Sequence, residues 1–154
     1  MKQKRWWFKV TSDNFTNKLS RSLSALERRH RRFMNLTLGA DGLPADIPYR
    51  YITAIKRYPN TSQDFLADLF GIDKSLVARK TRKMEVSELI TREPDPDNRR
   101  QYMLKLTDKG EETYLLIVKR SNEWEALITG GIEEADLITT SDVISRIIEN
   151  LDKC

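Results

Sequence analysis

The side chains best suited to chemistry in this chain are cations gathered in two short segments. Residues 74–84 hold five basic side chains and no acidic one. Arg99 and Arg100 lie in a second segment, residues 94–101, which is rich in proline, aspartate and asparagine. Lysine and arginine at this density attract polyanions such as nucleic acids. The alternative is a solvated helix face beside an ordinary turn. The secondary-structure elements that carry these cations distinguish a polyanion-binding surface from this alternative.

The first group of cations follows the pattern of a helix-turn-helix. Thr61 or Ser62 can cap a first helix, and Gly71 suits the left-handed residue that ends it. Asp73 can then cap a second helix, which carries the cations. Packing of such a pair needs a small residue, a glycine four positions later and an aliphatic residue six positions beyond, and the chain supplies Ala67, Gly71 and Val77. The sequence therefore predicts two helices joined by a short turn.

The second of these helices presents one charged face. Val77, Thr81 and Met84 share a side at helical spacing and are expected to face the core. The opposite face holds the predicted DNA contacts, which are Lys74, Ser75, Ala78, Arg79, Arg82 and Lys83. In the major groove we expect the arginines to contact guanine or phosphate and the lysines to contact phosphate. Serine can bond a base edge or phosphate, and the alanine methyl can meet thymine.

A hairpin is expected after the second helix. Residues 89–93 and 102–107 have the composition of two strands, and the segment between them has strong turn chemistry. Arg99 and Arg100 stand at its tip, where they suit a narrow minor groove because its negative potential attracts arginine. A hairpin directly after a helix-turn-helix makes the winged form of the motif.

The rest of the chain is predicted to be helical, with many apolar positions. A heptad seam crosses residues 13–36 and consists of Phe15, Leu19, Leu23, Leu26, His30 and Phe33. A short helix is expected from Pro48, with Tyr51, Ile52, Ile55 and Tyr58 on its apolar face. Two further helices are expected, from Thr107 to about Thr129 and from about Glu133 to Leu151.

The predicted order of elements is α-α-α-α-β-β-α-α, a mainly α fold with a small β-hairpin wing. We predict a winged helix-turn-helix DNA-binding domain over residues 39–112. Residues 1–38 and 113–154 form a helical dimerisation region, because a 154-residue monomer cannot easily bury the seam and two more apolar helices. The expected assembly is a homodimer.

Charge and hydropathy narrow the class of protein. The net charge of +4 divides into +9 for residues 1–58, +1 for residues 59–120 and −6 for residues 121–154. The basic part indicates a polyanion partner. The sequence has no run of eighteen apolar residues, and its basic, aromatic N-terminus does not resemble a signal peptide. We therefore expect a cytoplasmic protein with no membrane partner.

Few residues suit catalysis or metal binding. His30 is the single histidine and Cys154, the last residue, is the single cysteine, so a His-rich or Cys-rich metal site is excluded. The sequence also lacks a glycine-rich phosphate loop and a nucleophile motif. We expect no enzyme activity, no metal and no cofactor. The remaining alternative to operator binding is a winged-helix module that binds protein or RNA without operator specificity.

Residues 58–112 resemble the MarR family of bacterial transcription regulators. The resemblance lies in the segment Ser62 to Arg79, with its Gln63 and its Asp-Lys-Ser at residues 73–75, and in Leu106-Thr107-Asp108-Lys109-Gly110 after the hairpin. It implies a dimeric winged helix-turn-helix protein in which the first and last helices of two subunits intertwine. It also implies a near-palindromic operator, with repression as the commoner mode.

Two positions depart from the pattern of that family. Glu88 stands where the family has glycine after the recognition helix. A left-handed residue other than glycine costs about 1 kcal/mol or more, so we expect this helix to end differently. Asn98 replaces the aspartate that would orient Arg100 in the wing.

The resemblance further implies a small aromatic or phenolic anion as effector, bound between the dimerisation helices and the winged domain. Candidate pocket residues are His30, Tyr51, Tyr58 and Tyr114. His30 lies on the apolar seam and is expected to be a packing histidine; the alternative is a sensor of an anion or of pH at the pocket edge. Aromatic residues at helical spacing commonly belong to a core. Trp6 and Trp7 are expected to form an arm on the partner subunit, and Cys154 lies too far from the DNA-reading elements for a cysteine switch.

Overall fold

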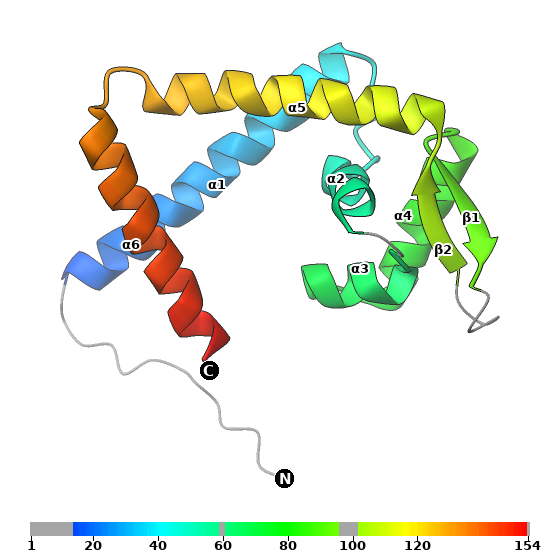
Figure 1. Cartoon of the computed structure of the whole chain (residues 1–154), viewed down its shortest axis with the longest axis horizontal. Coiled ribbons are helices and arrows are strands. Elements are labelled where there is room, and N and C mark those ends of the chain that lie inside the picture. The colour runs from blue at the N-terminus through cyan, green and yellow to red at the C-terminus, as the bar shows by residue number, and fades with distance from the viewer. Residues whose placement is uncertain (1–13, 59–60, 96–101, 154) are drawn as a thin grey trace, which may run out of the picture.

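A computed structural model describes residues 14–58, 61–95 and 102–153. The described elements are α1 (Asn14–Ala40), α2 (Tyr49–Arg57), α3 (Gln63–Phe70), α4 (Lys74–Val86), β1 (Ile90–Pro94), β2 (Tyr102–Leu106), α5 (Asp108–Thr129) and α6 (Glu134–Asp152). This order confirms the predicted fold class. In Figure 1, α2, α3, α4 and the hairpin gather at one end of the molecule, α1 and α5 extend from it, and α6 follows the far end of α5.

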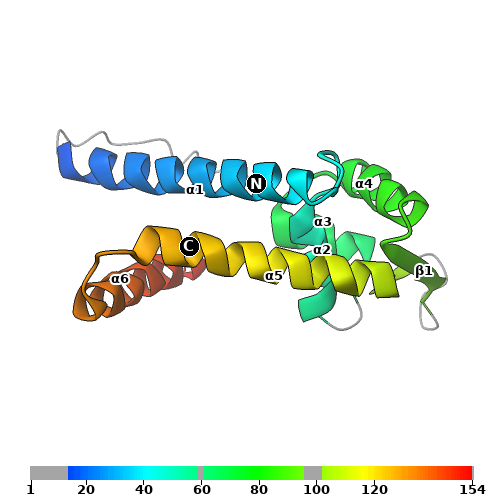
Figure 2. The same cartoon turned by 90° about the horizontal axis from the view of Figure 1, so that it is seen from above.

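The two longest helices link these parts. Figure 2 shows α1 and α5 extending in the same direction from the winged part, and Figure 1 shows that they lie at an angle to each other. The two helices are in contact. Because α5 is continuous from Asp108, the predicted boundary at residues 112 and 113 falls inside a helix. The division into a DNA-binding domain and a dimerisation region stays a prediction. None of the helices in the described ranges is long and apolar enough to cross a membrane.

Local capping explains where the helices of the winged part begin. Of the two candidates for the first cap, Ser62 performs it: its Oγ accepts a hydrogen bond from the Phe65 amide at 3.1 Å. Asp73 accepts from the Ser75 amide at 2.7 Å, and Thr107 caps α5. Pro48 precedes α2 as its N-cap residue and does not lie in its first turn. These contacts confirm the predicted starts of α3, α4 and α5.

The core lies where the C-terminal end of α1 meets α2, α3, α4, the hairpin and α5. Its buried apolar side chains are Met34, Leu38, Ile47, Tyr51, Ile52, Ala54, Ile55, Leu66, Ala67, Val77, Met84, Leu89, Ile90, Leu104 and Ile117. Val77, Thr81 and Met84 are completely buried, which confirms the predicted inner face of α4. The Thr81 hydroxyl donates to the Val77 carbonyl at 3.0 Å and accepts from the Gln63 side chain at 2.8 Å, so α3 and α4 are joined by a satisfied buried polar group.

Much of the predicted seam remains open in the single chain. Leu19, Leu23 and Leu26 are each about 40% exposed, and no described residue of α6 is buried. Burial on α1 falls instead on Met34 and Leu38, beyond the predicted stripe. A monomer of this shape leaves a large apolar surface in water, which is uncommon for a stable monomer.

The end of α4 corrects one prediction. Glu88 adopts the left-handed conformation, with φ 59°, so the helix ends in a left-handed residue although glycine is missing. The Glu88 amide donates to the Glu85 carbonyl and the Leu89 amide to the Met84 carbonyl, both at 2.9 Å, which is the Schellman pattern. These two bonds, together with the burial of Leu89, offset the cost of the left-handed residue.

Candidate nucleic-acid interface

The outer face of α4 holds the six residues predicted to contact DNA. Lys74, Ser75, Arg79, Arg82 and Lys83 are exposed, and Ala78 is half-buried. The face is set by the burial of Val77, Thr81 and Met84 on the other side. A rigid helix with exposed arginines and a small residue between them has the shape and donors that a major groove accepts. The structure thus brings the six residues together, while the contacts assigned to each stay predictions.

Carboxylates from other elements engage the lysines at the two ends of α4. Lys74 Nζ lies 2.9 Å from Asp64 Oδ2, and Lys83 Nζ pairs with the carboxylate of Asp46 in the α1–α2 loop. Lys80, which was not a predicted contact, donates to the Asp46 carbonyl at 2.8 Å. Sequence reasoning missed both aspartates because neither lies on α4.

The wing packs directly beside α4. The strands β1 and β2 pair antiparallel, from Ile90 opposite Leu106 to Pro94 opposite Tyr102. Their limits lie within one residue of the prediction. Arg92 Nε lies 2.9 Å from Glu85 Oε2 of α4, so the base of the wing is held against the recognition helix. Arg99 and Arg100, and Asn98 before them, lie outside the described residues, as do Trp6, Trp7 and Cys154.

The junction of the wing with α5 depends on a close backbone approach. A Cβ atom at Gly110 would lie 2.1 Å from the Leu89 carbonyl oxygen and 3.2 Å from the Leu106 Cβ atom. No side chain fits there, which explains the glycine in the Leu-Thr-x-x-Gly segment. The Thr107 cap, which accepts from the Gly110 amide at 3.1 Å, places α5 at this junction.

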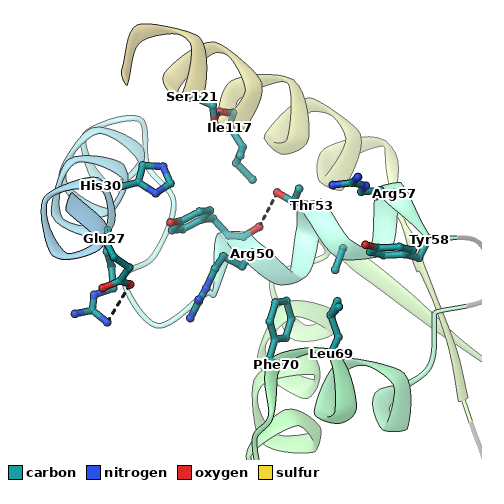
Figure 3. Close-up of a pocket in the computed structure, with 13 residues that line it drawn as sticks. Glu27, His30, Arg50, Thr53, Arg57, Tyr58, Leu69, Phe70, Ile117 and Ser121 are labelled. Carbon is teal, nitrogen blue, oxygen red and sulfur yellow. Dashed lines mark hydrogen bonds and ion pairs between the residues drawn. The ribbon is translucent and has the colours of Figure 1, made fainter. Parts of the chain in front are cut away.

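A second candidate site is a pocket of about 440 Å³ between the long helices and the winged part. Its lining comes from α1, α2, α3 and α5 and comprises Glu27, His30, Arg31, Tyr49, Arg50, Thr53, Ala54, Arg57, Tyr58, Leu69, Phe70, Ile117 and Ser121. Figure 3 shows these side chains arranged around the opening. The lining combines aromatic rings with several cations and one carboxylate, so it suits an aromatic ligand that carries negative charge.

Of the four predicted pocket residues, two line this pocket. His30 lies at its edge with its ring 5.2 Å from that of Trp124, and Tyr58 closes the end of α2. Tyr51 does not line the pocket, because it is buried in the core and its ring stacks on Phe70 at 5.1 Å. Tyr114 does not line it either: it packs against the core with the Lys56 ammonium 5.8 Å from its ring centroid. The lining of this pocket therefore does not support those two assignments.

The pocket residues that sequence reasoning missed come mainly from α2. Arg50, Thr53 and Arg57 share one side of this helix at spacings of three and four, a periodic signal that was available in the sequence. The Arg50 guanidinium lies 5.6 Å from the Phe70 ring centroid, within cation–π range. Burial raises the pKa of Tyr49, so its phenol stays neutral at physiological pH.

Comparisons with known proteins agree with this architecture. The model of the MarR family matches residues 48–102. The uncharacterized HTH-type transcriptional regulator YybA of Bacillus subtilis is 24% identical over 135 residues, which cover 88% of this chain and 85% of that protein. A crystal structure of MarR is 36% identical, with a TM-score of 0.76 and coverage of 88% of this chain and 91% of that chain.

A more distant structure shares the fold. A putative MarR family regulator from Listeria monocytogenes, solved in complex with a 26mer DNA, is 23% identical, with a TM-score of 0.74 and coverage of 85% and 87% of the two chains. The identity to MarR over nearly the whole chain, together with the match of the family model, decides the assignment. The chain belongs to the MarR family, whose members are transcriptional regulators and not enzymes.

Proposed function

We propose that the chain is a cytoplasmic homodimeric repressor that binds a near-palindromic operator through α4 and the wing. The observation that carries DNA recognition is the exposed face of α4, with Arg79 and Arg82 beside Ser75. Its inner face is completely buried, so the helix is held rigidly for insertion into a groove. The Listeria monocytogenes protein of the same fold, known in complex with a 26mer DNA, is consistent with this use of the fold.

Selection of bound fragments from the source genome, followed by binding titrations, tests operator recognition. Replacing Arg79 or Arg82 with alanine is expected to weaken operator binding about 10- to 100-fold, which corresponds to about 1–3 kcal/mol for an arginine that contacts a base. Arg28→Ala removes an exposed arginine of a different helix, α1, and serves as the matched control. Equal effects of the three variants would contradict the proposal. Salt-independent binding, or a preference for RNA or protein, would support the alternative winged-helix module instead.

The proposed dimer rests on the open seam of α1 and on the unburied α6. Leu23, 37% exposed, lies in the seam, and Ile148 of α6 is 53% exposed. Two subunits that bury these faces against each other would place their recognition helices about 34 Å apart for successive major grooves. Light scattering is expected to give about twice the chain mass of 18.0 kDa.

A charge in the seam tests the interface directly. Leu23→Glu is expected to give monomers at micromolar concentration, because a carboxylate would be buried without a partner. Leu36→Glu, at a 63% exposed position of α1 outside the seam, is the matched control and should stay dimeric. A wild-type monomer would refute the dimer.

The proposed effector is a small aromatic or phenolic anion in the 440 Å³ pocket. Arg50 and Arg57 offer charge-assisted hydrogen bonds, and Phe70 offers an aromatic surface. In calorimetric titration with benzoate and hydroxybenzoate, Arg57→Ala should weaken binding at least tenfold. Lys56→Ala, on the same helix but outside the lining, should leave ligand binding unchanged.

Comparing His30→Ala with wild type over pH 5.5–8 tests whether His30 senses an anion or pH. An unchanged ligand and pH response would show that His30 is a packing histidine.

A further inference from the structure

The lysines at the two ends of the recognition helix are already paired with anions of the protein. Lys74 contacts Asp64 at 2.9 Å and Lys83 contacts Asp46. All four side chains are between 39% and 65% exposed, so the pairs lie on the surface that faces solvent. Arg79 and Arg82, between them on α4, make no ion pair within the described residues. The cations of one helix face thus differ in whether a carboxylate engages them.

The fold holds both carboxylates near their lysines. Asp64 stands in the first turn of α3, two residues after the Ser62 cap. Asp46 belongs to the α1–α2 loop, which is anchored at its other end because Asp41 accepts two hydrogen bonds from the Arg120 guanidinium, at 2.6 and 2.7 Å. The Lys80 ammonium also donates a hydrogen bond to the backbone carbonyl of Asp46. Neither aspartate can move far from α4 without breaking these contacts.

A DNA phosphate and an aspartate carboxylate are competing partners for an ammonium group. Exposed lysine–carboxylate pairs are weak and salt-sensitive, so a phosphate can displace the carboxylate. Displacement costs the contact between lysine and carboxylate and leaves the negative carboxylate close to a polyanion, which reduces the gain from the phosphate contact. The contact between Lys83 and Asp46 lowers the pKa of Asp46, and the contact between Lys74 and Asp64 raises the pKa of Lys74. Asp46 and Lys74 are therefore charged at neutral pH.

We infer that Asp46 and Asp64 compete with DNA phosphate for Lys83 and Lys74, and that they thereby limit the affinity for duplex DNA and its dependence on salt. The inference rests on the proposed binding of DNA through α4. It assigns a role in DNA binding to two acidic residues that lie outside the recognition helix. Removing either carboxylate should strengthen binding, which is the opposite of what removal of a supporting residue would do.

The test measures the affinity of full-length Asp46→Asn and Asp64→Asn for an operator fragment and for an unrelated duplex, between 50 and 200 mM salt. Each freed lysine that contacts phosphate steepens the plot of log affinity against log salt by about 0.9, hence by about 2 for a dimer. The ratio of affinities at 50 and 200 mM should then rise about tenfold. Glu111→Gln frees Lys56, its partner at 2.7 Å, away from α4 and is the matched control. Its slope should equal that of wild type.

A second variant identifies the cation responsible. Adding Lys74→Gln to Asp64→Asn should return the slope to that of wild type or below, and Asp64→Glu should behave as wild type because it restores the carboxylate. Thermal melting confirms that each variant is folded. Unchanged slopes, or weaker binding by Asp64→Asn and Asp46→Asn, would overturn the inference while leaving operator binding intact. Loss of the proposed function itself would be seen differently, as wild-type protein that binds neither duplex.

Discussion

Glu88 provides a direct test of how backbone strain was accommodated at the end of the recognition helix. Within the described ranges it is the non-glycine residue with positive φ, at 59°. Its side chain is 82% exposed and lies 3.8 Å from Lys109, a contact that contributes little at such exposure. Glu88→Gly should therefore remove the strain without removing a significant side-chain contact, and the two Schellman hydrogen bonds use only backbone atoms.

The expected gain follows from two opposing effects. A left-handed conformation costs a residue with a Cβ atom about 1–2 kcal/mol relative to glycine. Glycine also increases the conformational entropy of the unfolded chain, which lowers the free energy of unfolding by about 0.4–1 kcal/mol. We therefore expect Glu88→Gly to raise the free energy of unfolding by about 0.5–1 kcal/mol. For a chain of this size that corresponds to a rise in melting temperature of about 1–4 °C.

Urea denaturation at one fixed protein concentration measures this change, because the stability of a dimer depends on concentration. The control is Glu88→Ala, which removes the carboxylate and keeps the Cβ atom. It should be no more stable than wild type, and the denaturant slope should stay the same in both variants. Equal stability of the glycine and alanine variants would show that the left-handed residue carries no strain, and the reasoning would be refuted.

Three further substitutions test the packing that positions the recognition helix. Gly110→Ala places a Cβ atom 2.1 Å from the Leu89 carbonyl oxygen, so the free energy of unfolding in urea should fall by the ~1–3 kcal/mol of an overpacked site, and an unchanged value would disprove this close approach. Ser62→Ala removes the acceptor for the Phe65 amide and should cost ~1 kcal/mol in the same assay; a neutral result would mean that water replaces the cap. Leu66→Ala leaves a cavity at a completely buried site and should cost ~2–5 kcal/mol, whereas a loss below ~1 kcal/mol would show that the core closes around it.

The winged part was predictable because its signals are local. The capping serine and aspartate, the turn glycine and the buried side of α4 each depend on residues within a few positions of one another, so their chemistry is visible before the chain folds. The same holds for the end of α5, which was predicted at about Thr129 and lies there. Glu88 shows the limit of such rules. A residue with a Cβ atom disfavours the left-handed conformation, but the burial of Leu89 and two backbone hydrogen bonds stabilise that conformation here.

Contacts between distant parts of the chain were not predictable in this way. The types of four residues, three tyrosines and one histidine, suggested a ligand pocket. Only the packing of α1, α2, α3 and α5 decides that His30 and Tyr58 line the pocket, whereas Tyr51 stacks on Phe70 in the core. The aspartates that engage the ends of α4 come from a loop and from another helix, and Lys83 lies 37 positions from Asp46. The sequence by itself therefore determined the helix-turn-helix, its wing and the cationic face, because short-range hydrogen bonds and helical periodicity specify them. Only the tertiary structure decided which charges meet, because that depends on how helices far apart in the chain pack against each other.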